Sequence, residues 1–535
     1  MRTPWLRSRA RVVLKENGGG TRNMELKPSS LNWALKHVLK EGDTDLFPQP
    51  FEFNVIKKYW DEIRPDLAAI HINGHRWHGP RRLMVPKSEF GFRAVCQLDP
   101  VDSILFAALI REIGTKIERR RSPISRNDIF SYRFDPAPDG RLYAANTGWE
   151  QFWSTSASHC ETTSHVLVTD LSDFYNQIYH HTIENELNEC RIDSAYWHAL
   201  KNLLANTTEG VSRGIPIGPH PSHLIAELAM IPVDGFLRSL SVPYCRYVDD
   251  IHIFCNSERA ARSNLYKFAD YLDKTQKIQL NKQKTKLFPA NEFKPFCADN
   301  SVDKPINSLE RDVLLAVKSH TRSPYERVRI TRLSDDDLSK LAQEKIEKVL
   351  DDYLSAEEVD YVRLRWFIRR LAQIGAPGGV NFIVRKFDQF LPAISEVGKY
   401  FESAAPNYSG QWKDIGEELI TLFDSDLVQA SDYLQVVLLS LFSRIKDLNH
   451  IDRLTRLYDS ASPMCKRKIV LAAAVARARA WLSSLKGNYK DTDSWMRRAL
   501  IYSMRTLPKD ERTFWLNSVK RRVSGLDKRV ADFIS

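Results

Sequence analysis

The C-terminal part of the chain carries the apolar spacing of helices. Leu364, Phe367, Ile368 and Leu371 recur at i, i+3, i+4 and i+7, the spacing of one face of an amphipathic helix. The segment "DTDSWMRRALIYSMRTLPKDERTFW" predicts a helix capped near Asp493, a break at Pro508 and a second helix. From residue 301 to residue 535 we therefore expect an all-α region of stacked helical hairpins, with an irregular helical bundle as the alternative.

Residues 161 to 300 are patterned differently, with short β-branched and aromatic runs. "PYCRYVDDIHIF", residues 243 to 254, predicts two paired strands with Asp249 and Asp250 at the tip of a hairpin. In "SHVLVTDLSDFYNQIYHHTI", an apolar strand over Val166 to Val168 runs into Asp170, and a helix follows. Both segments thus place carboxylates at the ends of buried strands.

These acids have two interpretations. An Asp-Asp pair is often only a turn with both side chains in water. However, an acid at the exit of a buried strand lies where α/β architectures place their chemistry. Clustered carboxylates repel one another, and oxygen ligands suit Mg²⁺ or Mn²⁺. If the fold brings Asp170 to Asp249, the pair suits a two-metal site for phosphoryl transfer.

At this point the residues resemble a family, the reverse transcriptases. "YVDD" and "LVTDLSDFYNQI" are similar to motifs C and A, and "SRGIPIGPHPSHLIAELAMIPVD" to motif B, whose helix we expect to begin near Ser222. "IQLNKQKTKLF" resembles motif D, and "MVPKSEFGFRAVCQLDPVDSILFAALI" resembles the fingers segment. The five elements occur in the family's order over roughly residues 80 to 290.

The resemblance implies roles for these residues. Asp170 and Asp249 would bind Mg²⁺ directly, with Mn²⁺ as the alternative metal, and Asp250 would assist, so that all three acids form the catalytic and metal site. The expected dNTP-binding residues are Lys87, Arg93, Tyr175, Gly218 and Lys284. Lys87 and Arg93 would meet the triphosphate, whose charge paired cations stabilise.

Two further residues carry specific expectations. The ring of Tyr175 would leave no room for a 2′-hydroxyl, which favours deoxynucleotides. Gly218 ends the Gly-x-Pro-x-Gly of motif B and would let the backbone approach a base pair closely. Without the motifs, Tyr175 would be read as a core aromatic.

Motif B departs from the common pattern. Ile217 stands where many reverse transcriptases have Gln, and Glu227 stands where Asn is common. An apolar side chain cannot hydrogen-bond a nucleotide or template, so strict template reading is in doubt. The sequence also has no endonuclease or maturase pattern, no retron thumb triplet and no RNase H segment.

The long helical tail resembles the HEAT-like domain of the abortive-infection reverse transcriptases, an antiviral branch found in bacteria and their phages. The resemblance implies an α+β fold, with reverse-transcriptase fingers and palm followed by an all-α, HEAT-like domain. It also implies a homo-oligomer and synthesis of single-stranded DNA that needs neither a template nor a nucleic-acid primer and starts on a protein tyrosine. There are two alternative functions: a conventional RNA-templated reverse transcriptase, of retron or group II intron type, and a non-catalytic nucleic-acid-binding scaffold.

The composition of the chain is consistent with this interpretation. A formal charge of +11 suits a polyanionic partner, and seven cysteines without a Cys-x-x-Cys pair favour a reducing bacterial cytoplasm. No apolar stretch reaches the length of a membrane span. We expect a disordered arm or mis-started N-terminus over 1–23, N-terminal helices and fingers over 24–160, the palm over 161–300 and the helical domain over 301–535.

Overall fold

The computed structural model describes residues 23–144, 148–301, 305–320, 328 and 330–535. The N-terminal arm expected over 1–23 lies almost wholly outside the described residues. The first helix of the region expected from residue 24 begins at Pro28. The N-terminal helices are α1 (Pro28–Lys40), α2 (Glu52–Lys58), α3 (Trp60–Ala68) and α4 (Pro100–Arg120).

Helix α4 is the centre of the N-terminal half. Asp99 caps it by accepting a hydrogen bond from the Val101 backbone, and Pro100 occupies the first turn, where a missing N–H costs nothing. Every residue from Ser103 to Ile110 is buried, because α1 packs on one side of α4 and α9 (Ser222–Ser239) on another. A helix buried all round is expected at the core of a domain.

The fingers segment forms an antiparallel hairpin of β1 (Arg81–Pro86) and β2 (Phe92–Gln97). The palm is a second sheet with the strand order β4-β5-β3-β6, all antiparallel. Its strands are β3 (His165–Asp170), β4 (Tyr244–Tyr247), β5 (Asp250–Cys255) and β6 (Lys286–Pro289).

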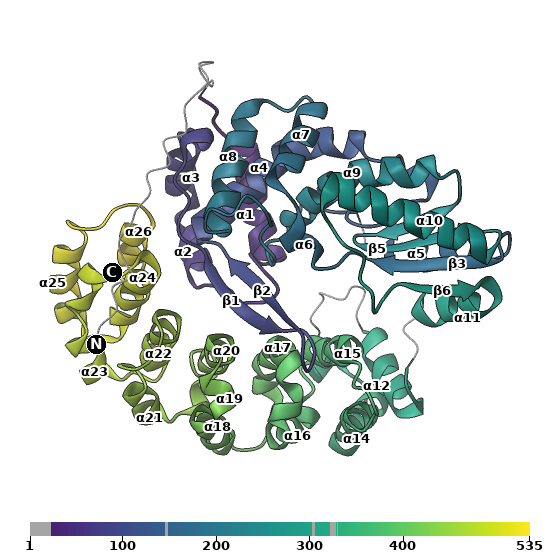
Figure 1. Cartoon of the computed structure of the whole chain (residues 1–535). Coiled ribbons are helices and arrows are strands. Elements are labelled where there is room, and N and C mark those ends of the chain that lie inside the picture. The colour runs from purple at the N-terminus through teal and green to yellow at the C-terminus, as the bar shows by residue number, and fades with distance from the viewer. Residues whose placement is uncertain (1–22, 145–147, 302–304, 321–327, 329) are drawn as a thin grey trace, which may run out of the picture.

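The palm sheet is covered on both faces. Alternate residues of a strand point to opposite faces, and here Leu167 and Ile253 join the large core under α9 and α10 (Glu258–Tyr271). Val166 and Phe254 join a smaller core with α5 (Gly148–His159) and α11 (Ala290–Ser301). The sheet is therefore a fixed platform (Figure 1). The remaining palm helices are α6 (Phe174–Gln177), α7 (His180–Glu189) and α8 (Ser194–Thr207).

The C-terminal region is entirely helical in its described residues and forms a curved, two-layered array. One layer is a row in which each helix contacts the next: α15 (Tyr361–Ile374), α17 (Ile394–Ala404), α20 (Asp432–Phe442), α22 (Pro463–Val475), α24 (Ser494–Ser503) and α26 (Gly525–Phe533). The other helices are α12 (Ser308–Lys318), α13 (Asp335–Lys340), α14 (Gln343–Leu354), α16 (Val380–Arg385), α18 (Trp412–Thr421), α19 (Asp426–Gln429), α21 (Ile451–Arg456), α23 (Arg479–Ser484) and α25 (Lys509–Val519). The array draws an arc beneath the rest of the molecule (Figure 1), which confirms the expected HEAT-like domain.

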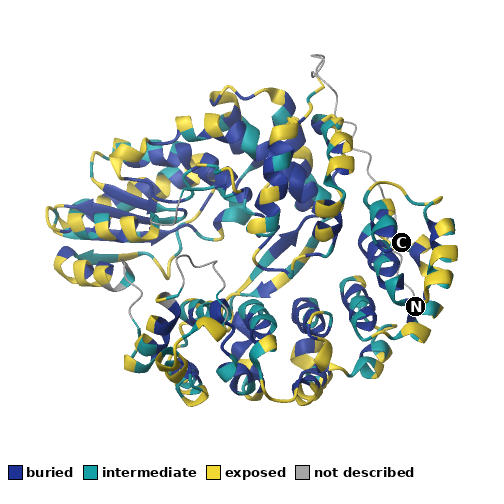
Figure 2. Ribbon diagram, turned by 180° about the vertical axis from the view of Figure 1, so that it is seen from behind, coloured by how far each residue is buried: buried dark blue, intermediate teal, exposed yellow. Residues whose placement is uncertain are grey.

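The predicted helix boundaries of the tail are also confirmed. The Asp493 side chain caps α24 by accepting a hydrogen bond from the Met496 backbone, and Pro508 immediately precedes α25. Leu364, Phe367, Ile368 and Leu371 of α15 are all fully buried. Figure 2 shows the same alternation of buried and exposed positions along the arc.

The tail packs against the fingers hairpin. Val85 and Val95 belong to the same core as the tail helices α15, α17 and α20, and the hydroxyl of Tyr433 donates to the Leu46 carbonyl at 2.7 Å. The hairpin thus shares its core with the tail, and its tip reaches the tail helices α15 and α17 (Figure 1), where Arg365 donates to the Lys87 carbonyl at 3.3 Å. No helix among the described residues is long and apolar enough to cross a membrane.

Candidate active site

The three predicted acids meet at one end of the palm sheet. Asp170 is the last residue of β3, and Asp250, the first of β5, is its partner in the antiparallel register. Asp249 lies between β4 and β5 in a two-residue turn with Val248. The fold therefore joins two segments that are far apart in the sequence, as the motifs predicted.

The acids are packed closely enough to perturb one another. Burial, and then the charges of Asp170 and Asp250, raise the pKa of Asp249 to about 8. Burial also raises the pKa of Asp250, against the opposing effect of Lys284. Raised pKa values in a carboxylate cluster are typical of catalytic sites, because neighbouring negative charges disfavour ionisation.

Lys284, from the motif D segment, lies among these acids. Its Nζ is 2.6 Å from Asp170 Oδ2 and 3.9 Å from Asp250 Oδ1. Asn281 also donates to Asp170 Oδ2, at 3.3 Å. The ammonium group supplies positive charge that the carboxylates need, so the structure places Lys284 beside the acids, while its contact with a nucleotide stays a prediction.

The carboxylates also fit a divalent cation. Asp170 Oδ1 is buried and has no hydrogen-bond partner among the described residues, and such an atom is costly unless something binds it. Carboxylate oxygens are the ligands that Mg²⁺ and Mn²⁺ prefer. In the described part of the chain no three acid, His or Cys side chains are arranged to hold a metal together. The observation that favours a cation here is therefore the unpartnered Oδ1 of Asp170.

The fingers hairpin brings one of its two predicted cations to the acids. Lys87 is exposed at the hairpin tip, and its charge lowers the pKa of Asp250. Arg93 lies on the hairpin face that carries Val85 and Val95. Its positive charge acts to lower the pKa values of Asp45, His223 and Tyr433. Lys87 is therefore the cation nearer the acids, whereas Arg93 lies between the palm and the tail.

Tyr175 is held beside the site by motif B. Its hydroxyl is 2.6 Å from His223 Nδ1, and the His223 ring stacks on Tyr132 with centroids 4.0 Å apart. Burial, and then Tyr132 and Asp249, raise the pKa of Tyr175. The ring is therefore fixed in position, and its role in excluding a 2′-hydroxyl stays a prediction.

The glycines of motif B adopt conformations that other residues avoid. Gly214 and Gly218 have φ values of +97° and +123°. A Cβ at Gly218 would lie 2.7 Å from the Cys96 carbonyl oxygen, so only glycine allows the loop to approach β2. The Ile217 carbonyl accepts from the Cys96 backbone at 2.8 Å, and α9 begins at Ser222 as predicted.

Sequence reasoning missed the residues directly behind the acid turn. Glu227, noted only as a departure from the common pattern, is fully buried and forms ion pairs with Arg121 and Arg246. Ser131 donates to it as well. One sequence signal could have identified these residues: a charged residue inside an apolar run is rarely buried without a partner. Arg246 in "PYCRYVDD" and Asp234 in "AMIPVDGF" are such residues.

Comparison with known proteins identifies the domain. Residues 108–303 match the model of the family "Reverse transcriptase (RNA-dependent DNA polymerase)". No curated protein matches the chain. Residues 108–303 therefore form a reverse transcriptase domain, and the protein is an enzyme, a nucleotidyltransferase of the RNA-directed DNA polymerase type.

Two solved structures are more distantly similar. Telomerase from Candida albicans, in complex with a TWJ fragment of telomeric RNA, has 11% identity and a TM-score of 0.31, over 68% of this chain and 67% of that one. Apo telomerase from Candida tropicalis has 11% identity and a TM-score of 0.32, over 70% and 72%. Both scores are too low to indicate a shared overall fold, so the family match alone identifies the domain.

Proposed function

We propose that this reverse transcriptase domain makes DNA from dNTPs without a template, starts on a tyrosine hydroxyl of the protein, and acts in abortive-infection defence against phages. The observation that carries the proposal is the position of the tail. It follows the palm directly and packs its core against the fingers hairpin through Val85 and Val95. A polymerase thumb that grips a template-primer duplex would normally follow the palm.

The side chain of Ile217 supports synthesis without a template. It packs against the core of the tail, and its carbonyl is bonded to the Cys96 backbone. Neither group is therefore available to hydrogen-bond a templating base at this point of motif B. Glu227, the second departure in motif B, is bound by Arg121 and Arg246 instead of a nucleotide.

The chemistry follows from the acids and cations at the end of the sheet. Asp170 and Asp249 would hold Mg²⁺, which lowers the barrier to attack on the α-phosphate. The attacking hydroxyl oxygen forms a bond to the α-phosphorus, the bond to the bridging oxygen breaks, and pyrophosphate leaves. Lys87 lies where it can offset charge on the triphosphate, while Lys284 holds Asp170 in place.

A tyrosine hydroxyl can replace the 3′-hydroxyl of a primer as nucleophile. The test is to incubate purified protein with labelled dNTP and Mg²⁺ alone, followed by denaturing electrophoresis with and without protease. We expect label to migrate with the protein and to be released by protease, and none in an Asp249→Asn control.

Three results would contradict the proposal. Label that is free of protein before protease treatment excludes priming by the protein. Label that appears only when template and primer are added, with a product sequence set by the template, indicates a conventional reverse transcriptase. Absence of incorporation under every condition would favour a non-catalytic nucleic-acid-binding scaffold.

The defence role has a separate test. Bacteria that carry the parent gene should reduce phage plating relative to bacteria that carry Asp249→Asn, at equal protein levels. Equal plating on both would remove the antiviral role and leave the polymerase assignment intact. Sedimentation of the purified protein tests the homo-oligomer that the family resemblance implies.

A further inference from the structure

A closed ionic network lies behind the acid turn. Arg246, from β4, donates through Nε to Asp234 Oδ1 at 2.6 Å and through Nη2 to Asp234 Oδ2 at 2.8 Å and Glu227 Oε2 at 2.9 Å. Arg121, at the end of α4, donates to the same Glu227 oxygen at 2.7 Å. The side chains of Arg121, Arg246 and Glu227 are 0% exposed. Three elements, α4, α9 and β4, therefore meet in one desolvated cluster.

The network holds both backbone groups of a single residue of the turn. Arg246 Nη1 donates to the Val248 carbonyl at 2.8 Å. The Val248 N–H donates to Ser131 Oγ at 2.8 Å, and the Ser131 hydroxyl in turn donates to Glu227 Oε1 at 2.5 Å. Val248 is thus connected to Glu227 on one side and to Arg246 on the other.

Val248 needs this support because of its conformation. Its φ is +59°, in the left-handed region that a β-branched residue strongly disfavours. Such a conformation costs about 1–3 kcal/mol and persists only where the surroundings impose it. Asp249 is the next residue, so the direction of its carboxylate depends on the conformation of Val248.

We infer that Glu227, Arg246 and Ser131 are positioning residues, which hold Val248 left-handed and so fix Asp249 for the transfer reaction. The inference rests on the proposed polymerase function, in which Asp249 binds the metal. It explains why Glu227 stands where the common pattern has Asn. The carboxylate accepts from Ser131 and from two arginines at once, which an amide, with a single acceptor oxygen, cannot do.

If Glu227 only stabilised the core, its substitution would be expected to have a different effect. A matched control variant distinguishes this structural role from the positioning role. In the tail, Glu310 is also fully buried, pairs with Arg363 and accepts from the Tyr353 hydroxyl. Glu310→Gln removes a comparable buried charge from the tail, outside the network behind the turn. If the network behind the turn only stabilises the core, Glu227→Gln and Glu310→Gln should have equal effects on turnover.

The experiment measures the denaturation midpoint, kcat and KM for dNTP incorporation in parent, Ser131→Ala, Glu227→Gln and Glu310→Gln. We expect kcat to fall by about tenfold to a hundredfold in Ser131→Ala and Glu227→Gln, with KM nearly unchanged, because a small displacement of a catalytic group has effects of that order. Glu310→Gln should lower the denaturation midpoint and leave kcat unchanged.

Rescue provides the decisive readout. Glycine adopts positive φ without strain, so Glu227→Gln combined with Val248→Gly should regain most of the lost kcat. An unchanged kcat in Ser131→Ala, or no rescue by Val248→Gly, would overturn the inference while the parent enzyme still polymerises. Absence of incorporation by the parent would instead remove the proposed function and, with it, the positioning role.

Discussion

At the scale of single residues, the carboxylate of Asp249 has the strongest chemical argument for catalysis. It lies beside Asp170 and Asp250, and burial together with their charges raises its pKa to about 8. Three acids at the end of one sheet would repel each other unless cations stand among them, as Lys284 does. The cluster is therefore better explained by function than by stability.

Asp249→Asn should abolish dNTP incorporation and leave the fold intact. A neutral amide is a poor metal ligand, so the Mg²⁺ that offsets the charge of the triphosphate would be held less tightly. The free energy of unfolding should stay the same or increase, because a like-charge contact is relieved. Incorporation assays and urea denaturation check this, with the exposed Asp273→Asn as control. Near-normal incorporation by Asp249→Asn would remove the two-metal assignment.

Tyr175 carries a prediction about sugar selection. Its hydroxyl is held 2.6 Å from His223 Nδ1, so the ring cannot swing away from an incoming 2′-hydroxyl. Tyr175→Val should therefore admit ATP, with a modest loss of dATP use. The ratio of dATP to ATP incorporation in the parent, Tyr175→Val and the exposed Tyr266→Val measures it. If the ratio does not change, Tyr175 is simply a core aromatic.

At the scale of elements, helix α22 contains a buried amine that its neighbours disfavour. Lys468 is 8% exposed and forms no ion pair with any described residue. Burial, and then the charges of Arg444 and Arg467, hold its pKa well below the usual value of 10.5. The helix thus buries this side chain at a net cost in stability.

Lys468→Met should increase the free energy of unfolding at pH 7 by about 1–3 kcal/mol, the usual cost of burying a polar group without a partner. Between the lowered pKa of the folded chain and pH 10.5, the unfolded chain binds a proton at this position and the folded chain does not. The stability of the parent should therefore rise with pH up to 10.5, and the gain in Lys468→Met should shrink accordingly.

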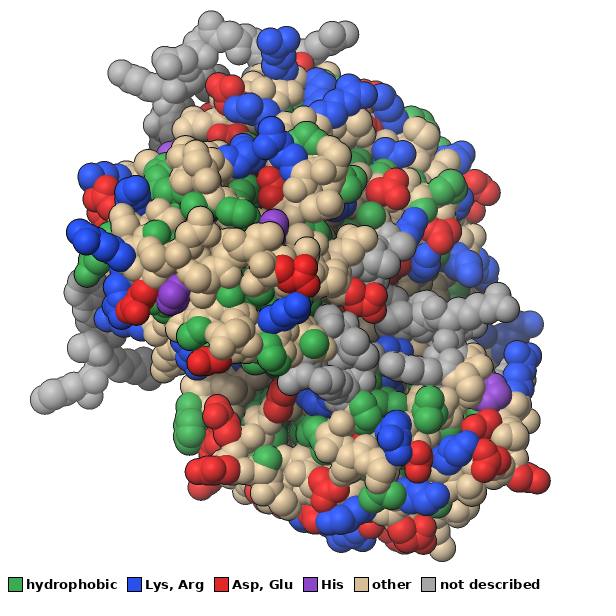
Figure 3. All heavy atoms as spheres, turned by 90° about the vertical axis from the view of Figure 1, so that its right-hand side faces the viewer, with side chains coloured by type: hydrophobic (Ala, Val, Ile, Leu, Met, Phe, Trp, Pro, Cys, Tyr) green, Lys and Arg blue, Asp and Glu red, His purple; other side chains and the backbone are tan. Residues whose placement is uncertain are grey.

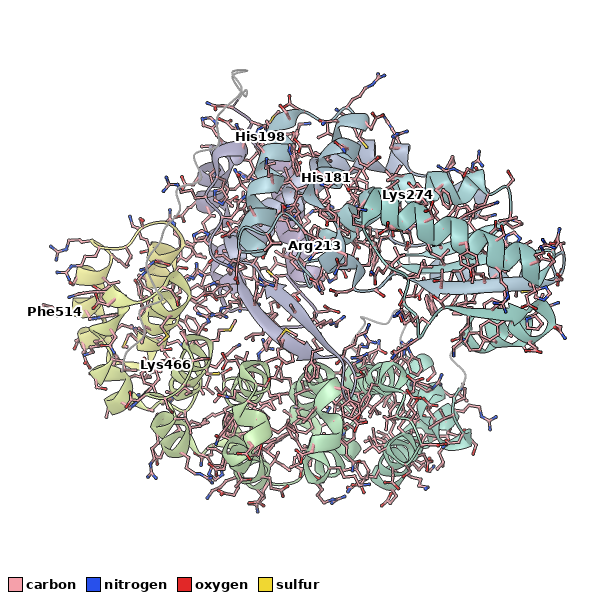
Figure 4. The ribbon with its side chains drawn as sticks, in the orientation of Figure 1. His181, His198, Arg213, Lys274, Lys466 and Phe514 are labelled. Carbon is pink, nitrogen blue, oxygen red and sulfur yellow. The ribbon has the colours of Figure 1, made fainter. Side chains whose placement is uncertain are left out.

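Urea denaturation at pH 7 and pH 10 measures the effect. Lys466→Met is the matched control, because Lys466 lies on the same helix but is less buried (Figure 4). A gain of equal size at both pH values, or a loss at pH 7, would show that Lys468 is charged and bound in the folded state.

The elements themselves were largely predictable, because their signals are local. Neighbours within a few residues determine three of them: the apolar run of β3, the tip of the β4–β5 hairpin and the helix cap at Asp493. The positions of Lys284 and Tyr175 followed from resemblance to the motifs, since spacing alone does not assign them.

Other features depend on contacts between distant segments, which single-sequence patterns do not encode. Glu52 and Arg467 form a buried pair across 415 residues of sequence. The placement of Arg93 between palm and tail depends on how the hairpin packs, and one face of β2 looks much like the other in sequence. The sequence also does not show where the net charge of +11 lies: on the face in Figure 3, Lys and Arg side chains are interspersed with Asp and Glu.

At the scale of the whole molecule, the end of the tail is locked to the polymerase half by buried ion pairs. Arg498, from α24, donates to Asp99 at the start of α4 at 2.5 Å and to Glu52 of α2 at 3.2 Å. Arg467 donates to Glu52 at 2.8 Å. The fingers hairpin joins the same cluster, because the guanidinium of Arg81 stacks 3.7 Å from the centre of the Trp495 ring. The tail therefore supports the hairpin that carries Lys87.

Arg498→Met should destabilise the molecule by about 3–5 kcal/mol, because it leaves Asp99 buried without its cation. Arg497→Met, on the same helix, should cost no more than about 1 kcal/mol, since the Arg497 pair with Asp527 is partly exposed. Urea denaturation measures both.

Hydrogen exchange of residues 81–97 tests whether the tail supports the hairpin. If it does, exchange over these residues should be slow in the parent and in Arg497→Met, and faster in Arg498→Met. If Arg498→Met loosens only the tail helices and leaves exchange over 81–97 unchanged, the hairpin holds its position without the tail. The tail would then not replace a thumb by supporting the fingers.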